Sequence, residues 1–368
     1  MSAGGAGRRP PSRSPSSAPA GAGRIYVTDC EGPLTKNDNA QEIAERFVPD
    51  GAEFFARLSR YDDFLADVVR KPDYNAGDTL RLIPPFLKAF YVTDEDVESF
   101  SAERVLLVPE ALKVLDAVSA LMPAYIISTS YTPYLKALCA LAGFPLDRVR
   151  CTELSLDVWR MPEEESAWLR EVTGQVLARP VIEIPDGASS TGDLSPRDRE
   201  TVAEFDDLFW TRMAGRVSAD MVAAVRPVGG GQKLAALEAI VAAEGVAGSG
   251  VMYVGDSITD APPLEAVKAW GGVSLSFNGN GYAIAAAEFA AASPDAEVQA
   301  QLARAFASGG RDGVEAAVRA WPQPMKDERP RGRARATVGV VAEAREALAE
   351  ASAAARRSVR GEQAARLG

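Results

Sequence analysis

The feature that most constrains the fold is an alternation of helical and strand patterns between residues 229 and 277. Residues 229–245 (GGGQKLAALEAIVAAEG) form a glycine turn followed by a helical pattern, and residues 250–254 are a short apolar run typical of a buried strand. A helical pattern at 261–270 and a further apolar run at 272–277 follow. Strands that alternate with helices indicate a mostly parallel sheet with helices on both faces. The segment therefore predicts an α/β fold, with a Rossmann-like, doubly wound sheet.

The same alternation occurs earlier in the chain, where it is interrupted twice. Strand patterns at 24–28, 124–127 and 149–156 belong with helical patterns at 109–122 and 132–142. Residues 36–105 carry helical spacing of apolar residues and contain no good strand, so a helical unit is inserted after the first strand. The expected organisation is a disordered tail at 1–23, an α/β core at 24–35, 106–156 and 228–307, the helical insertion at 36–105, a second insertion at 157–227 and a basic, Ala-rich extension at 325–368.

Composition excludes several classes of function. The chain has no histidine, which removes Ser-His-Asp triads, histidine phosphatases and His-ligated metal hydrolases. A net charge of −11 argues against a nucleic-acid partner, and the basic residues that cluster at 8–24 and 326–366 are expected to be solvated tails. No apolar run is long enough for a membrane span. Cys30, Cys139 and Cys151 are too few for a disulfide framework, so we expect reduced thiols in a cytoplasmic protein.

Polar side chains stand at the ends of three expected strands and at the start of one helix. The ligand site of such a sheet lies beyond the carboxyl ends of its strands, so these side chains are candidates for a common site. They are Asp29 and Glu31 after the first strand, Ser128 after the second, Lys233 behind the glycine turn, and Asp256 and Asp260 in the stretch VMYVGDSITDAPPLE.

Each residue type has a chemical use at such an edge. A strand-end aspartate such as Asp29 can act as a nucleophile that forms an acyl-phosphate, and a second carboxyl group such as Glu31 can protonate the leaving oxygen. Paired carboxylates suit Mg²⁺, which prefers hard oxygen ligands. A lysine in the first turn of a helix opposes the helix dipole, so Lys233 indicates a need to balance several carboxylates and a phosphate. Taken singly, each residue also fits an ordinary cap, turn or surface position.

The order of these residues resembles the motif series of the haloacid-dehalogenase-like (HAD-like) superfamily, in its phosphoserine-phosphatase-like branch. The stretch STSYTPY is similar to that branch's S-G-G-F-T-x-[FY] motif, and the Lys-helix-strand-GDxxxD tail is similar to the family's last two motifs. A closer resemblance, over residues 24–290, is to the group named energy-converting hydrogenase A subunit R-like. The stretches DCEGP, RYDDFLAD and SLSFNGNGYA carry it.

The resemblance implies a role for each of these positions. Asp29 would be the phosphorylated nucleophile, and Glu31 would be the general acid and base, where most family phosphatases have Asp. Mg²⁺ would be held by Asp29, the backbone carbonyl of Glu31, Asp256 and, directly or through water, Asp260. Ser128, Thr129 and Lys233 would hold the phosphoryl group. The insertion at 36–105 would be a cap over the site, with Arg60 as a contact for an anionic leaving group.

The implied activity is Mg²⁺-dependent hydrolysis of a small phosphorylated metabolite, in a protein that could form a homodimer. Transfer of the phosphoryl group to an acceptor other than water would use the same residues. The alternative from another class is a HAD-fold accessory or regulatory protein, associated with a hydrogenase, with little or no catalytic activity.

Overall fold

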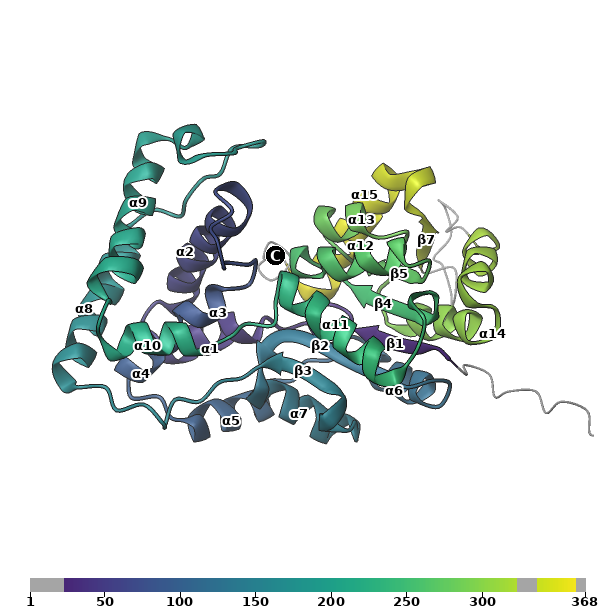
Figure 1. Ribbon diagram of the computed structural model, residues 1–368, viewed down its shortest axis with the longest axis horizontal. Helices are drawn as coiled ribbons and strands as arrows, with labels where there is room; N and C mark the ends of the chain where they lie inside the picture. Colours follow the sequence, from purple (N-terminus) through teal and green to yellow (C-terminus); the bar gives the residue numbers. More distant parts are fainter. Residues whose placement is uncertain (1–22, 323–335, 362–368) are drawn as a thin grey trace, which may run out of the picture.

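A computed structural model describes residues 23–322 and 336–361 of the chain (Figure 1). Residues 1–22 of the expected tail, and residues 325–335 and 362–368 of the expected extension, lie outside the described residues. Among the residues it describes, no helix combines the length and the apolar character needed to cross a membrane.

The core is one seven-stranded sheet in the order β3-β2-β1-β4-β5-β6-β7. Every pairing is parallel except the last, between β6 and β7, which is antiparallel. The expected mostly parallel α/β sheet is therefore confirmed. The strands are β1 (Ile25–Thr28), β2 (Ala124–Tyr131), β3 (Val149–Thr152), β4 (Val251–Gly255), β5 (Val273–Phe277), β6 (Phe289–Ala292) and β7 (Thr337–Val340).

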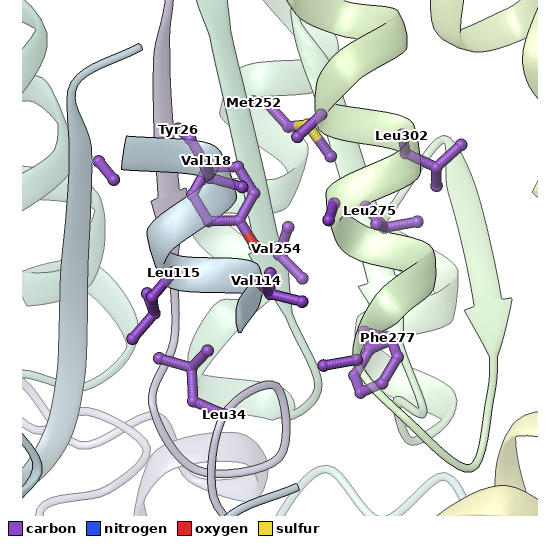
Figure 2. Packing of buried hydrophobic residues seen from close by; sticks show 14 of the residues in the cluster. Tyr26, Leu34, Val114, Leu115, Val118, Met252, Val254, Leu275, Phe277 and Leu302 are labelled. Carbon is purple, nitrogen blue, oxygen red and sulfur yellow. The ribbon is translucent and has the colours of Figure 1, made fainter. Parts of the chain in front are cut away.

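Helices cover both faces of the sheet (Figure 1). Alternate residues of a strand point to opposite faces, so Tyr26 faces one hydrophobic cluster while Ile25 and Val27 face the other. Figure 2 shows the first cluster, in which Val114 and Leu302 approach the sheet from two helices. The helices of the core are α6 (Ala111–Ser119), α7 (Thr132–Ala142), α11 (Gly230–Glu244), α12 (Ala261–Ala269), α13 (Gly281–Ala286), α14 (Glu297–Arg319) and α15 (Val341–Arg360).

A helical unit, on the left in Figure 1, lies beside the carboxyl ends of the central strands. Its helices between β1 and α6 are α1 (Asn39–Phe47), α2 (Gly51–Asp63), the π-helix η1 (Phe64–Val68), α3 (Thr79–Leu82), α4 (Pro84–Ala89) and α5 (Asp94–Glu103). Those between β3 and α11 are α8 (Glu163–Ala178), α9 (Pro196–Asp207), the π-helix η4 (Leu208–Arg212) and α10 (Val217–Ala224).

The two inserted segments share one hydrophobic core. Phe54 and Phe86 of the first segment belong to the same buried cluster as Leu169 and Phe205 of the second. Polar contacts also join them, because the hydroxyl of Tyr61 donates to Asp206 at 2.6 Å and accepts from the indole of Trp210 at 2.9 Å. The two insertions therefore form a single helical unit, which the sequence does not indicate because these contacts are far apart along the chain.

The C-terminal segment departs from the sequence interpretation. Residues 340–358 carry a helical pattern that α15 matches, but the basic residues of this segment are expected to be solvated, and for its described part that expectation is wrong. β7 completes the edge of the sheet beside β6, and Val341 and Leu348 of α15 are buried together with Ala290 of β6 and Ile284 of α13. α15 also buries Arg356, whose exposed fraction is 3%. Burial of apolar side chains, which contributes about 1.5–3 kcal/mol for a fully buried Leu or Val, outweighs the solubility of the basic residues.

Candidate active site

The candidate site lies where β1 and β4, the central neighbours of the sheet, reach their carboxyl ends. Asp29 follows β1, and its backbone N–H donates to Val254 of β4 at 2.9 Å. Asp256 follows β4, and Asp260 lies one turn further on. All three aspartates are buried, and each offers a carboxylate oxygen within 4.8 Å of the other two. The parallel pairing of the two strands thus brings together carboxylates that are more than 220 residues apart in the chain.

Lys233 neutralises two of these carboxylates from the first turn of α11. Its Nζ is fully buried and lies 2.7 Å from Asp29 Oδ2 and 2.8 Å from Asp260 Oδ1. Burial alone would lower the pKa of Lys233, but the two carboxylates raise it above its ordinary value. Burial raises the pKa of Asp29, and the Asp260 carboxylate adds to that rise while Lys233 opposes it. Lys233 is therefore a permanent cation at this edge.

Asp260 is engaged on both oxygens. Oδ1 also accepts from the hydroxyl of Tyr253 at 2.8 Å, and Oδ2 accepts from the backbone N–H groups of Asp256 at 3.0 Å and Ser257 at 3.1 Å. Despite burial, these donors and Lys233 lower the pKa of Asp260 below its ordinary value. Asp260 thus holds Lys233 and the loop after β4 in place.

The turn after Asp29 approaches Asp256 so closely that only glycine fits. Gly32 has a φ of +95°, and a Cβ added there would lie 2.2 Å from the carboxyl carbon of Asp256. Gly255 meets a similar limit, since its Cβ would lie 2.4 Å from that of Asp260. Gly32 thus allows the loops after β1 and β4 to pack against each other, and Gly255 allows the loop after β4 to fold back on its own strand end.

Glu31 faces the same cavity and is bound by the helical unit. The backbone N–H of Asn39, at the start of α1, donates to Glu31 Oε1 at 2.7 Å. Burial raises the pKa of Glu31 to about 8, and the neighbouring Asp38 carboxylate adds to the rise, against the opposing effect of Arg360. Near neutral pH, Glu31 is therefore a carboxylic acid that can give up a proton.

Ser128 and Thr129 lie in an irregular part of β2. The pairing of β2 with β3 shifts register between Ile127 and Tyr131, which turns this segment toward the site. Ser128 Oγ accepts from the backbone N–H of Ser130 at 3.2 Å, and Thr129 Oγ1 donates to the carbonyl of Val228 at 3.1 Å. Both residues line the cavity that contains Asp29.

That cavity, of about 110 Å³, lies between the sheet edge and the helical unit. Its walls combine the strand-end residues with Phe55, Ser59 and Asp62 of α2. The Asp62 carboxylate accepts from the backbone N–H of Gly77 at 2.9 Å, and burial raises its pKa well above the ordinary value. The cavity is thus rich in carboxyl groups on both of its sides.

Arg60 does not join the strand-end residues. It lines a larger cavity, of about 530 Å³, which shares Asp63 and Ile258 with the first. Arg60 Nη1 lies 3.0 Å from Asp63 Oδ2, and Nε donates to the carbonyl of Ile182 at 3.2 Å. Tyr282 of α13 also lines this cavity.

Two arginines of α15 enter the site, and the sequence did not single them out. Arg356 Nη1 donates to Asp256 Oδ2 and, at 3.1 Å, to the backbone carbonyl of Asp256. Arg360 Nη1 donates to the same Oδ2 at 3.1 Å. Their spacing of four residues places them on one helix face, and this spacing is the feature of the sequence that could have pointed to the pair. Nothing local indicates that this helix reaches Asp256, because its position follows from the pairing of β7 with β6.

The donor set at this edge fits a divalent cation. Asp29 and Asp256 carry hard carboxylate oxygens close together, the class of ligand that Mg²⁺ prefers, whereas Asp260 already binds Lys233 and four further donors. The three cysteines are free thiols, and none belongs to this carboxylate cluster.

The comparisons with known proteins found similarity among solved structures. No family model and no curated protein matches the chain. The structure of a gene product of Archaeoglobus fulgidus is similar, with a TM-score of 0.79 and 28% identity, and the match covers 94% of this chain and 99% of that one. A substrate-bound phosphoserine phosphatase gives a TM-score of 0.42 at 13% identity, over 73% of this chain and 91% of that one. A HAD family hydrolase from Salmonella enterica gives 0.39 at 13% identity, over 72% and 65%.

Proposed function

We propose that the chain is a HAD-like phosphohydrolase that cleaves a small-molecule phosphate monoester in a Mg²⁺-dependent reaction. One observation carries the proposal: Asp29, Asp256 and Asp260 are buried together at the carboxyl ends of neighbouring strands, with the buried Lys233 between two of them. Burying four ionisable groups is unfavourable in free energy, and a sheet edge with only a structural role would not require it. The same arrangement matches what nucleophilic phosphoryl transfer requires.

In the first half of the proposed reaction, a carboxylate oxygen of Asp29 attacks phosphorus and the bond to the leaving oxygen breaks. Glu31 gives its proton to that oxygen, since the raised pKa keeps Glu31 protonated near neutral pH. Lys233 orients Asp29, and Ser128 and Thr129 line the cavity in which the phosphoryl oxygens would lie. The products are an aspartyl-phosphate at Asp29 and the free alcohol.

In the second half, Glu31 takes a proton from water, the water oxygen attacks phosphorus, and the bond between phosphorus and Asp29 breaks. Inorganic phosphate leaves, and Glu31 and Asp29 return to their initial states. Asp29, Asp256 and the backbone carbonyl of Glu31 would hold the cation. When bound, Mg²⁺ would neutralise negative charge on the phosphoryl oxygens.

The second cavity is lined by three carboxylates, those of Asp63, Asp67 and Asp186, and by two arginines, which would be the contacts for an anionic leaving group. Arg60 places a guanidinium in its wall, and Arg70 lines the same cavity. Guanidinium groups bind carboxylates and phosphates through paired N–H donors. We therefore propose a small phosphorylated metabolite that carries a second acidic group.

The test is a screen of phosphorylated metabolites and a generic aryl phosphate, with and without Mg²⁺. We expect release of inorganic phosphate that depends on Mg²⁺ and is lost in Asp29→Asn. A folded protein that binds Mg²⁺ but turns over no member of the panel would contradict the proposal.

A second candidate is an accessory protein of the same fold, as the hydrogenase-related resemblance implies. The engagement of Asp256 by Arg356 and Arg360 favours it, because a catalytic cation would use the same carboxylate. This candidate predicts no turnover, no Mg²⁺ binding and a stable protein partner on purification.

A further inference from the structure

We infer that Arg356 and Arg360 are positioning residues that compete with a divalent cation for Asp256, so that the C-terminal helix α15 sets the cation affinity of the site. The inference rests on the proposed function in one respect, which is that Asp256 is a cation ligand.

The first observation is that both guanidinium groups bind one carboxylate oxygen. Arg356 Nη1 and Arg360 Nη1 both donate to Asp256 Oδ2, and both side chains line the cavity that contains Asp29. The side chains of Arg356 and Arg360 are only 4% and 6% exposed, so water screens these contacts poorly. A cation that binds Asp256 must therefore compete with the hydrogen bonds that Arg356 and Arg360 already donate to this carboxylate.

The second observation is that the fold anchors both arginines. Arg360 Nη2 donates to the carbonyl of Asn37 at 2.8 Å, and its Nε donates to the carbonyl of Lys36 at 3.3 Å. Arg356 also donates to the backbone carbonyl of Asp256 at 3.1 Å. Leu348, about two turns before Arg356 on α15, is buried against Gly339 of β7. The guanidinium groups are therefore held at the site by α15 and by the loop before α1.

The third observation concerns charge. Asp29, Asp256 and Asp260 carry three negative charges when ionised, Lys233 carries one positive charge, and the two arginines carry two more. The guanidinium pair thus supplies the same +2 as a divalent cation, and together with Lys233 it balances these three aspartates without one, while Asp38 adds a further carboxylate to the same cavity. A cation that enters while both arginines stay in place meets two positive charges at hydrogen-bond distance from its own ligand.

The experiment is a calorimetric titration of Mg²⁺ into the full-length protein and into Arg356→Gln and Arg360→Gln. The matched control is Arg357→Gln, which removes the same charge from the exposed face of the same turn. We expect Mg²⁺ to bind each of the two site variants at least about tenfold more tightly than the parent, since charge-assisted hydrogen bonds of this kind contribute at that level. The control should bind like the parent.

A second readout is the thermal midpoint with and without Mg²⁺. Mg²⁺ should raise the midpoint more in the two variants than in the parent, because at a fixed Mg²⁺ concentration a ligand with a lower Kd for the folded state stabilises that state more. If Arg356→Gln does not fold, Arg360→Gln carries the test alone, since Arg360 meets the same oxygen. Unchanged or weaker binding in the folded variants, or binding in none of the proteins, would overturn the inference.

Phosphatase assays on the same samples separate this inference from the proposed function. Turnover by the parent with no gain in Mg²⁺ affinity in the variants would remove the inference and leave the function. A gain in Mg²⁺ affinity in the variants without turnover in any sample would leave the inference and remove the proposed function.

Discussion

At the level of single residues, the electrostatics of the candidate site depend most on Lys233. It is fully buried, and it is paired with two buried carboxylates. A buried charge that loses its partner is strongly unfavourable, so the two aspartates depend on this lysine for stability as well as for any chemistry.

Replacement of Lys233 by Met should lower the free energy of unfolding by about 3–5 kcal/mol, because it leaves Asp29 and Asp260 without their shared cation. Chemical denaturation measures this change. Lys113→Met is the matched control, since the Lys113 side chain is 80% exposed and its loss should leave the free energy of unfolding unchanged. Equal stability of the two variants would mean that the buried pairs do not form as described.

Gly32 gives a second prediction at this scale. Gly32→Ala and Gly143→Ala both place a side chain at a positive φ, of +95° and +62°, which costs about 1–2 kcal/mol. Only at Gly32 does the new Cβ collide with Asp256, whereas Gly143 has no heavy atom within 4 Å of that position. Denaturation should therefore show Gly32→Ala to be less stable than Gly143→Ala by about another 1–3 kcal/mol. Similar losses in both variants would contradict the close approach of the two loops.

The residues at the strand ends could be predicted from sequence because the chain itself marks them. Asp29, Ser128 and Asp256 each follow an apolar run, and the structure places all three in the wall of one cavity. Their catalytic roles stay predictions. Arg356 and Arg360 could not be predicted in this way, since their helix reaches Asp256 only through a strand pairing that leaves no local pattern.

At the level of elements, the edge of the sheet determines where α15 lies. β5 and the helix before it follow patterns that the sequence contains, but β6 and β7 were not predicted. The β6 sequence is FAAA, an alanine run without the alternation or the β-branched residues typical of a strand. β7 pairs only with β6, so its identity as a strand depends on a contact across 45 residues or more.

Leu348→Ala should weaken the attachment of β7 to the edge of the sheet. Leu348 is 2% exposed, and its loss should cost about 2–5 kcal/mol, as for other buried leucines. Hydrogen exchange at residues 337–340 measures the effect directly, and we expect faster exchange there. Glu346→Ala, on the exposed side of the same helix, is the control and should leave exchange as in the parent. Undiminished protection in Leu348→Ala would show that β7 does not depend on α15.

At the level of the whole molecule, the candidate site belongs to neither the sheet nor the helical unit alone. The sheet supplies Asp29 and Asp256, α2 supplies the facing wall, and Asn39 at the start of α1 binds Glu31. Sequence spacing predicted a helical insertion after the first strand, which the structure contains. It did not indicate that the second insertion shares its core, because that core is built from contacts such as Tyr61 with Asp206, which are 145 residues apart.

The second cavity leads to a prediction at this scale. Arg60→Ala should raise KM for a substrate with an anionic leaving group by about tenfold or more and change kcat little, because the lost contact acts on binding. Steady-state kinetics with such a substrate, and with an aryl phosphate whose leaving group is neutral, separate an effect on leaving-group binding from an effect on the chemical step. Arg46→Ala removes an exposed arginine outside both cavities and should behave as the parent. An equal loss of kcat with both substrates would contradict a role in leaving-group binding.

The central claim is that Asp29 is transiently phosphorylated, and the most direct measurement is to identify the phosphorylated residue. Acid quenching during turnover of an aryl phosphate, followed by borohydride reduction, converts an aspartyl-phosphate to homoserine, which peptide mass spectrometry locates. We predict homoserine in place of Asp29 in the parent, and none in Asp29→Asn treated in the same way. Release of phosphate with Asp29 unmodified, or with the modification at another residue, would contradict the account.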